Sequence, residues 1–399
     1  MKILLITLIS IITIYFSYFI IMCIGLFKKK TNNNTKNKKH KFAILIAARN
    51  EEKVILNLIK SLNKQKYPKA LYKTYVILNN CTDNTKEIVL KTNANILEVN
   101  NINSKGEALK YAYNYLSNDN TIDAYVIFDA DNIVDNNFLN SMNESLNNGY
   151  NVVQGFRNTK NINDNWLSSS YAIMYYIQGL FINKARFNLG KSAFLNGTGF
   201  MVKKSVIDKH GFNPKTITED IEFTMLCAIN NEKIAYNENA IFYDEQVVNL
   251  KDSIKQRKRW SFGTVKCLRY YFKPLVINMF KNKNFICLDV IMFYLTVFMQ
   301  VIIFIAFIVS LLFMIINTPN IISIYYSLLI SLSILLLGII FRTYLIKHYG
   351  NSIIENIGGI LIFDLFLLSW LPINIICLFK KSCSWDQIKH SRVVEIDNT

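Results

Sequence analysis

Two acidic clusters in this sequence have residue types that could take part in chemistry. Asp129 and Asp131 directly follow Tyr125 to Phe128, whose length and composition predict a buried strand. Carboxylates at the end of a strand can hold a divalent cation together with a diphosphate. The second cluster is Thr218-Glu219-Asp220, which alone predicts a helix start with Thr218 as its cap. Neither cluster alone identifies a catalytic or metal site, because polar turns and helix starts have the same composition.

A third polar cluster, at residues 256–260, combines side chains of different chemistry. On a helix, Gln256, Arg259 and Trp260 lie on one face, because residues three and four positions apart are neighbours there. This face offers an amide, a guanidinium suited to phosphate and a ring suited to stacking. Arg257 and Lys258 would point elsewhere, toward solvent or lipid head groups. An amphipathic surface helix would explain the charges but not the combination on that face.

The elements that must position these clusters alternate between strands and helices. Short apolar runs with the length of buried strands are followed by segments with apolar residues at helical spacing. Such alternation predicts an α/β domain with a mainly parallel sheet, whose ligands bind where the carboxyl ends of the strands open. The predicted strands are residues 42–47, 75–78 and 125–128, and the predicted helices are residues 51–63, 85–92 and 105–116.

Hydrophobic residues make up 51% of the 399-residue chain and are concentrated near its two ends. Three runs carry no charged residue, and each is long enough to cross about 30 Å of hydrocarbon as a helix. A fourth run contains Asp364 and Pro372 and is a weaker candidate. No small-residue cleavage site follows the first run, so we expect a membrane anchor and not a signal peptide. The runs are Ile3–Phe27, Val290–Ile316, Ile321–Phe341 and Ile357–Phe379.

Lysines around the first run indicate its orientation. Only Lys2 precedes it and seven lysines follow, so the positive-inside rule places the chain after residue 28 in the cytoplasm. The net charge of +17 does not require nucleic acid as a partner, because many lysines stand beside hydrophobic segments, where they would face anionic head groups. Seven scattered cysteines without a Cys-x-x-Cys pair suit a reducing cytosol. We therefore expect a multi-pass protein of the cell membrane. The seven lysines are Lys28, Lys29, Lys30, Lys36, Lys38, Lys39 and Lys41.

The order of the polar clusters resembles that of a family 2 glycosyltransferase. The similarity is to the membrane-bound branch that includes cellulose, hyaluronan and poly-N-acetylglucosamine synthases, and it covers residues 42 to about 265. It implies a GT-A fold, which is a Rossmann-like α/β domain with a mainly parallel sheet, here cytosolic and flanked by transmembrane helices. The motifs are Ala47-Ala48-Arg49-Asn50-Glu51-Glu52, Asn80-Cys81-Thr82-Asp83, Lys105-Gly106, Asp129-Ala130-Asp131, Asn196-Gly197-Thr198-Gly199, Thr218-Glu219-Asp220, Tyr243-Asp244-Glu245-Gln246 and Gln256 to Trp260.

This resemblance implies roles for individual residues. Asp129 and Asp131 would bind the diphosphate of a UDP-sugar through Mg²⁺ or Mn²⁺. Asp220, with Glu219 beside it, would be the catalytic base that deprotonates the acceptor hydroxyl. Arg259 would pair with the diphosphate, and Trp260, on the same motif, would stack on the acceptor sugar. The other residues implied in substrate binding are Ala47, Glu51, Asn79, Asp83, Lys105 and Gln256.

Asn79 departs from the pattern of this branch, which usually has Asp at the end of the second strand to hold the uracil. A carboxamide can accept a hydrogen bond from uracil N3–H and donate one to O4, so uridine binding is compatible with Asn79. The resemblance therefore indicates the family more directly than it indicates a uridine nucleotide as part of the donor.

These predictions divide the chain into six segments. Asp364 at the centre of a bilayer would cost about 2.5 to 3.5 kcal/mol on insertion scales, so we expect a re-entrant or interfacial segment at residues 353–379. The alternative is that Asp364 pairs with a neighbouring helix. The segments are an anchor (1–27), a basic linker (28–41), the GT-A domain (42–265), an interfacial helix (266–285), C-terminal membrane segments (286–379) and a cytosolic tail (380–399) that contains Trp385, Lys389, His390 and Arg392.

Three functions fit the sequence. The first is the inverting, metal-dependent transfer of sugar from UDP-GlcNAc or UDP-Glc to a growing β-linked polysaccharide at the cytoplasmic face. The second is the addition of one or a few sugars to a membrane lipid. Ceramide-type enzymes carry a similar Gln-x-x-Arg-Trp motif, and this chain has fewer hydrophobic segments than the large synthases. The third, a non-enzymatic scaffold or sugar-nucleotide sensor, is disfavoured by the complete set of motifs. The sequence does not identify an accessory subunit or an oligomeric state.

Overall fold

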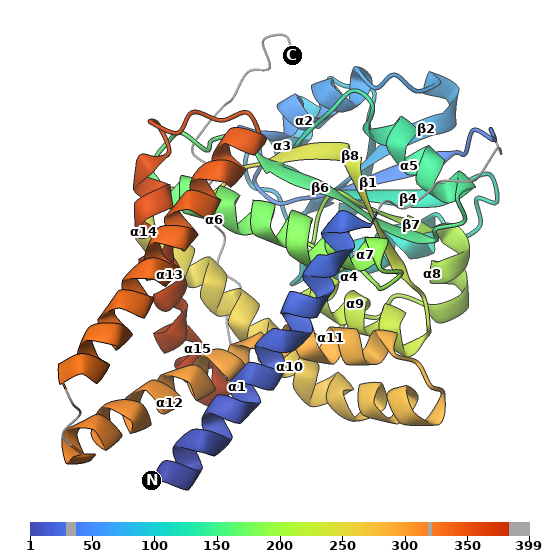
Figure 1. Ribbon diagram of the computed structural model, residues 1–399. Helices are drawn as coiled ribbons and strands as arrows, with labels where there is room; N and C mark the ends of the chain where they lie inside the picture. Colours follow the sequence, from blue (N-terminus) through green and yellow to red (C-terminus); the bar gives the residue numbers. More distant parts are fainter. Residues whose placement is uncertain (29–36, 318–320, 383–399) are drawn as a thin grey trace.

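The computed structural model describes residues 1–28, 37–317 and 321–382, and it contains an α/β domain with long helices on one side (Figure 1). Its eight-stranded sheet has the order β3-β2-β1-β4-β7-β6-β8-β5. β1 is parallel to β2 and β4, whereas β7 is antiparallel to β4 and β6. The predicted mainly parallel α/β fold is confirmed, with a mixed second half. The strands are β1 (Phe42–Ala48), β2 (Tyr72–Asn79), β3 (Asn95–Val99), β4 (Ala124–Asp129), β5 (Ile133–Val134), β6 (Val152–Thr159), β7 (Phe200–Lys203) and β8 (Ile234–Asp244).

The helices of the domain follow the predicted order. The three predicted spans correspond to α2 (Ile55–Asn63), α3 (Thr85–Leu90) and α4 (Lys105–Tyr115), although α2 begins later than residue 51. Ser104 caps α4, because its side chain accepts a hydrogen bond from the backbone of Glu107 at 3.2 Å. The remaining helices are α5 (Phe138–Asn147), α6 (Trp166–Ile177), α7 (Ala185–Asn188), α8 (Lys204–His210) and α9 (Glu219–Ile229), with a π-helical turn (Gln178–Lys184) between α6 and α7.

The sequence of β1 is a continuous apolar run because both faces of this strand are buried. Phe42 and Ile44 belong to the core that includes residues of α2 and α5, whereas Ala43 and Leu45 belong to the core on the opposite side, with α4 and α6. Successive side chains of a strand point to opposite faces of the sheet, and helices cover both faces here. The strand therefore needs apolar residues at every position, up to the edge where the functional residues begin.

Four helical stretches of the described residues are long and apolar enough to cross a membrane, namely Lys2–Phe27, Thr296–Asn317, Ile324–His348 and Ile357–Phe379. Figure 1 shows α1 (Lys2–Cys23), α12 (Thr296–Asn317) and α13 (Ile321–His348) extending away from the domain. The predicted run at residues 290–316 is divided, because α11 (Ile286–Tyr294) ends before α12 begins. These helices indicate that the protein associates with a membrane.

The helix that carries the Gln-x-x-Arg-Trp motif is α10 (Leu250–Lys281), a continuous helix of 32 residues. The boundary predicted between residues 265 and 266 falls inside it, so the motif and the predicted interfacial helix are one element. Arg257 is fully buried, and its Nη1 donates hydrogen bonds to Phe366 O at 3.3 Å and Ser369 Oγ at 2.6 Å. The expectation that Arg257 faces solvent or head groups is therefore wrong.

The last hydrophobic run forms two helices, α14 (Ile357–Leu368) and α15 (Trp370–Phe379). α14 packs against α6, and α15 packs along α10, where Arg269 Nη2 donates a hydrogen bond to Leu378 O at 2.7 Å. Both helices thus remain in contact with the domain or with α10. This arrangement favours a re-entrant or interfacial segment, which stays a prediction.

Asp364 on α14 pairs with Arg342 on α13. Two N–H groups of the guanidinium donate to the two carboxylate oxygens, each over 3.0 Å. Arg342 is only 4% exposed, so each charge lowers the cost of placing the other in apolar surroundings. The alternative expectation, that Asp364 pairs with a neighbouring helix, describes the structure correctly.

Part of the basic linker and almost all of the tail lie outside the described residues. Among the described linker residues, Lys38 Nζ lies 3.1 Å from Asp123 Oδ1, and Lys41 Nζ donates to Thr121 Oγ1 at 2.6 Å. Both lysines contact the domain, and the approach of linker lysines to lipid head groups stays a prediction. The predicted features outside the described residues are Lys29, Lys30 and Lys36 and the tail residues Trp385, Lys389, His390 and Arg392.

Candidate functional site

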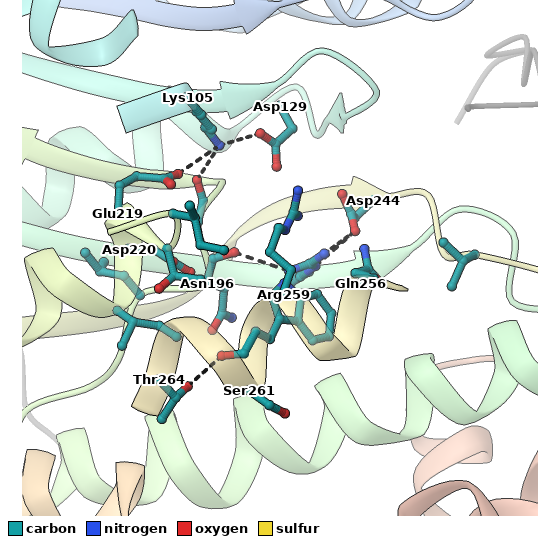
Figure 2. Close-up of a pocket in the computed structure, with 18 of the residues that line it drawn as sticks. Lys105, Asp129, Asn196, Glu219, Asp220, Asp244, Gln256, Arg259, Ser261 and Thr264 are labelled. Atoms are coloured by element: carbon teal, nitrogen blue, oxygen red, sulfur yellow. Dashed lines mark hydrogen bonds and ion pairs between the residues drawn. The ribbon is translucent and has the colours of Figure 1, made fainter. Parts of the chain in front are cut away.

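A cavity of about 870 Å³ opens at the carboxyl ends of β1, β2 and β4 and continues between α10, α12 and α15. Ligand sites typically have volumes of about 300 to 1,000 Å³, so this cavity has room for a large substrate or for two. Every predicted site residue except Asp83 lines it, as the close-up of part of the lining illustrates (Figure 2). These residues are Ala47, Glu51, Asn79, Lys105, Asp129, Asp131, Glu219, Asp220, Gln256, Arg259 and Trp260.

Asp83 supports the site from outside the cavity lining. Its carboxylate accepts hydrogen bonds from the backbone and hydroxyl of Thr85, at 3.0 and 2.5 Å, and from the backbone of Glu52 at 3.1 Å. Burial raises the pKa of Asp83, but these hydrogen bonds outweigh burial and hold the pKa below its usual value. Asp83 therefore ties together the loops that follow β1 and β2, and its predicted contact with substrate stays a prediction.

Three carboxylates meet at the edge of the sheet. Asp129 at the end of β4, Asp131 just beyond it and Asp244 at the end of β8 each offer an oxygen, and these oxygens lie within 4.8 Å of one another. Carboxylate oxygens are the hard ligands that Mg²⁺ and Mn²⁺ prefer, so the three residues fit such a cation. Asp244 belongs to a motif quoted for the family resemblance, but sequence reasoning gave it no role. Its place at the end of a strand resembles that of Asp129, although the strand itself is less apolar.

Asp244 is 3% exposed and lies beside Arg157 of β6. Arg157 forms an ion pair with it and also donates a hydrogen bond from Nη1 to Asn196 O at 3.2 Å. Burial raises the pKa of Asp244 to about 6, although the charge of Arg157 opposes this shift. Arg157 is a cavity residue that sequence reasoning missed, because no motif marks it.

Lys105 lies between the three carboxylates that could hold a cation and the two acidic residues at the start of α9. Its Nζ forms an ion pair with Asp129, donates to Gly197 O at 2.8 Å and lies 3.9 Å from Glu219 Oε1 (Figure 2). Gly197 has a φ of +79°, and a Cβ there would lie 3.3 Å from Asp220 Oδ2. A glycine at this turn therefore lets the backbone approach the Asp220 carboxylate closely.

Burial dominates the electrostatics of Glu219 and Asp220. It raises the pKa of both carboxyl groups, and Lys105 opposes the rise at each of them. The positive charge of Arg259 also lowers the pKa of Asp220, and both residues line the cavity. A carboxylate with a raised pKa is a stronger base than an exposed one, and it still ionises near neutral pH when cations lie beside it.

Glu222, one turn further along α9, holds the segment that leads to this acidic pair. It is buried and accepts hydrogen bonds from the backbones of Lys215 and Thr216, the latter at 2.8 Å, and from Tyr271 of α10 at 2.6 Å. Gly263 of α10 lies so close that a Cβ there would come within 2.2 Å of Thr218 Oγ1. These contacts fix Glu219 and Asp220 against α10, and sequence reasoning did not detect them.

The predicted face of α10 is present. Gln256, Arg259 and Trp260 all line the cavity, whereas Arg257 points away from it into the packing against α14 and α15. The ring of Trp260 is nearly parallel to that of Trp370 on α15, with centroids 6.3 Å apart and planes at 27°. Trp370 Nε1 donates a hydrogen bond to Ser261 Oγ at 3.1 Å, which fixes the second tryptophan.

The cavity is also lined by helices that follow α10 in the chain. α11, α12, α14 and α15 contribute only uncharged side chains to the lining, in contrast to the sheet edge. The cavity therefore has a charged end at the sheet and an uncharged end among the membrane helices. The residues of the uncharged end include Val297, Gln300, Leu367 and Asn374.

The fold and the site together define a GT-A type enzyme domain. Residues 40–263 match the family described as "Glycosyltransferase like family 2". This match covers more than half of the chain, so the protein belongs to glycosyltransferase family 2.

Two curated relatives and one solved structure illustrate the similarity. A beta-monoglucosyldiacylglycerol synthase from Nostoc sp. is 26% identical over 266 residues, which are 64% of this chain and 55% of that protein. The probable glycosyltransferase YdaM from Bacillus subtilis is 26% identical over 275 residues, which are 65% of this chain and 63% of that protein. The chain therefore spans little more than half the length of the first relative.

The solved structure is the mannosyltransferase PcManGT from Pyrobaculum calidifontis in complex with GDP-Man and Mn²⁺. It superposes with a TM-score of 0.65 at 13% identity and covers 94% of this chain and 97% of that protein. At this identity the similarity shows the fold alone. It extends over the membrane-type helices as well as the sheet, because it covers almost the whole of both chains.

Proposed function

We propose that this protein transfers a sugar from a UDP-sugar to a hydroxyl group of a membrane lipid at the cytoplasmic face. The observation that carries the proposal is the shared cavity, in which the acidic residues at the sheet edge and the uncharged surface of the membrane helices meet. A water-soluble donor can enter from the charged end, and an acceptor embedded in the bilayer can reach the same space from the other end.

At the charged end, Asp129, Asp131 and Asp244 would hold a divalent cation, which when bound supplies charge to stabilise the leaving diphosphate. The Mn²⁺ named with PcManGT supports this part of the proposal. Arg259 and Lys105 add positive charge on the same side, and Asn79, which lines the cavity at the end of β2, would contact the nucleotide. These residues bind and orient the donor.

At the acceptor side, Asp220 removes the proton of the attacking hydroxyl. The hydroxyl oxygen forms a bond to the anomeric carbon while the bond from that carbon to the diphosphate oxygen breaks, so UDP leaves with the bonding electrons. Because the attack comes from the face opposite the leaving group, an α-linked donor gives a β-linked product. The β-glucosyl product in the name of the Nostoc relative supports this outcome and glucose as the transferred sugar.

The polysaccharide synthase that the sequence favoured has less support than its lipid alternative. The name of the Nostoc relative describes a glycolipid product, and the cavity ends among helices whose lining is uncharged. The scaffold or sensor reading is opposed by the burial of Glu219 and Asp220 next to Lys105, because buried carboxylates with raised pKa values are typical of catalytic sites.

Product analysis tests this proposal. Membranes that contain the protein would be incubated with UDP-Glc, UDP-GlcNAc and diacylglycerol, and the products would be separated and weighed by mass spectrometry. We expect a lipid that is heavier by one or a few sugar residues and that disappears in the Asp220→Asn variant. Products of many sugar residues would support the polysaccharide alternative, and the absence of any transfer would contradict both.

The orientation of the domain can be tested separately. Lys60 is exposed on α2, so a cysteine placed there in a variant without other reactive thiols should react with an impermeant reagent once cells are opened. We expect no labelling in intact cells, because the lysines after the first run favour the cytoplasm. Labelling in intact cells would place the domain outside.

A further inference from the structure

Two amide side chains interrupt the uncharged end of the cavity. Asn374 of α15 donates a hydrogen bond from Nδ2 to Oε1 of Gln300 on α12, and both residues line the cavity. Asn374 is only 2% exposed, and its Oδ1 has no hydrogen-bond partner among the described residues. A buried amide oxygen in apolar surroundings is costly unless something binds it. The pair therefore offers hydrogen-bonding capacity that the described part of the protein does not use.

The position of this pair connects it to the acceptor side of the site. Asn374 follows Trp370 by four residues on α15, so the two side chains lie one above the other on the same face of the helix. Trp370 in turn packs against Trp260 of the Gln-x-x-Arg-Trp motif. Asp220, Trp260, Trp370 and Asn374 all line one continuous cavity. A molecule whose hydroxyl is at Asp220 can therefore extend along the tryptophans to the amide pair.

The charge of the lining indicates what kind of molecule this is. The cationic residues of the cavity, such as Lys105, Arg157 and Arg259, come from the catalytic domain and α10. None of the lining residues that α11, α12, α14 and α15 contribute carries a charge. A phosphate group at that end would lose its hydration without gaining a cation, whereas a hydroxyl or an ester carbonyl needs only hydrogen bonds.

We propose that Gln300 and Asn374 form a subsite for the uncharged polar head of the acceptor lipid and select neutral, hydroxyl-bearing lipids over phospholipids. Asn374 Oδ1 accepts a hydrogen bond from a lipid hydroxyl that is not the reacting one, or the amide N–H groups donate to an ester carbonyl. This contact positions the reacting hydroxyl near Asp220. The inference rests on the proposed transfer to a lipid and adds the class of lipid and the residues that recognise it.

A purely structural role would be to tie α12 to α15, and the two roles predict different kinetics. A subsite residue affects the concentration of acceptor lipid needed for half-maximal rate but not the binding or hydrolysis of the UDP-sugar. A helix tie affects all of these together with thermal stability. The variants Asn374→Leu and Gln300→Leu keep similar side-chain size and remove the hydrogen-bonding groups. Asn317→Leu is the matched control, because Asn317 is an exposed amide at the far end of α12 that does not line the cavity.

The full-length protein and its variants would be placed in vesicles with either diacylglycerol or phosphatidylglycerol as acceptor, at a fixed saturating concentration of UDP-sugar. We expect the wild type to use diacylglycerol in preference. In Asn374→Leu and Gln300→Leu the KM for diacylglycerol should rise about tenfold, the effect of one lost hydrogen bond of ordinary strength, while the KM for UDP-sugar, its slow hydrolysis and the thermal midpoint stay unchanged. Asn317→Leu should behave as the wild type.

Three results would overturn the proposal. One is an unchanged KM for diacylglycerol in both variants, and another is equal or better use of phosphatidylglycerol by the wild type. The third is a parallel loss of UDP-sugar hydrolysis and thermal stability in both variants, which would show that the pair only supports the helices. If the wild type glycosylates neither lipid although it binds UDP-sugar, the proposed function itself fails, and that outcome is distinct from the other three.

Discussion

The two ends of the cavity differ in how their chemistry is built. At the sheet edge, Asp129, Asp131 and Asp244 are placed by the ends of strands, and their charges are balanced by Lys105 and Arg157. At the membrane end the described lining comes from helices, and the residues that α11, α12, α14 and α15 contribute to it carry no charge and are polar only at a few positions. The first arrangement suits a charged, hydrated donor, and the second suits an acceptor that resides in lipid.

This difference shows how one cavity can bind two substrates, one from water and one from the lipid bilayer. The charged end binds by electrostatics and depends on a cation, a base and counter-ions. The uncharged end binds by burial of apolar surface and by single hydrogen bonds. Trp260 and Trp370 lie at the junction, where α10 meets α15. If this view is correct, changes at the two ends should have separable effects on donor and acceptor.

Removal of the cation should have the largest effect. Without Mg²⁺ or Mn²⁺ the carboxylates would repel the diphosphate, so chelator should reduce transfer to background and prevent UDP-sugar binding. Asp131→Asn should act in the same direction, whereas Asp208→Asn, at an exposed position on α8, is the control. Sugar transfer from radiolabelled donor and calorimetry measure both effects. Full turnover in chelator would show that the acidic cluster is not a metal site.

Loss of the base should be the next largest effect. Asp220→Asn keeps the shape of the side chain but cannot accept the proton, so transfer should fall by about 10² or more. The affinity for UDP-sugar, measured by calorimetry, should remain nearly unchanged. A variant that binds no UDP-sugar would instead place Asp220 in the donor pocket and blur the distinction between the two ends.

Trp260→Ala should have a smaller effect and only on the acceptor. Loss of the ring removes stacking worth about 1 kcal/mol, so the KM for acceptor lipid should rise by up to about tenfold while slow hydrolysis of UDP-sugar continues. Trp260→Phe keeps an aromatic ring and should recover most of the loss. If both variants lost UDP-sugar binding, the ring would belong to the donor end.

The pH dependence of transfer should show the smallest effect, and it tests the protonation of the base alone. Burial raises the pKa of Asp220, and only its deprotonated form can act as base, so the rate should fall as the pH is lowered through this raised pKa. The acid limb of the rate should lie above about pH 4, where an ordinary aspartate titrates. Steady-state transfer in vesicles at saturating donor measures it, with UDP-sugar binding at each pH as control. A rate that is constant down to about pH 4 would contradict the assigned base.

The charged end was largely predictable from the sequence, because its residues follow strands. Apolar runs predict β1, β2 and β4, and the residues at their carboxyl ends, such as Ala47, Asn79 and Asp129, must meet at one edge of a parallel sheet. Asp244 also lies at the end of a strand. That strand begins at Ile234 and contains the polar residues Asn237 and Glu238, so the sequence did not predict it. The family motifs added the roles that spacing alone leaves open.

The membrane end was not predictable in the same way. Gln300 and Asn374 stand in apolar segments without a motif, and only the packing of α12 against α15 brings them together. The burial of Arg257 depends likewise on α14 and α15, which lie about 110 residues further along the chain. Helical periodicity predicts on which face of a helix a residue lies, but it does not predict which element packs against that face. For this reason the acceptor was the part of the function that sequence left most open.

Site-specific photocrosslinking would test the central claim that the acceptor reacts from the membrane end. A photoreactive residue at Val297, which lines the cavity, would be compared with one at Phe307, which is exposed on α12. We predict that Val297 captures labelled acceptor lipid, that excess unlabelled acceptor reduces this capture, and that Phe307 captures bulk lipid without such competition. Equal capture at both positions, unaffected by the competitor, would contradict the account.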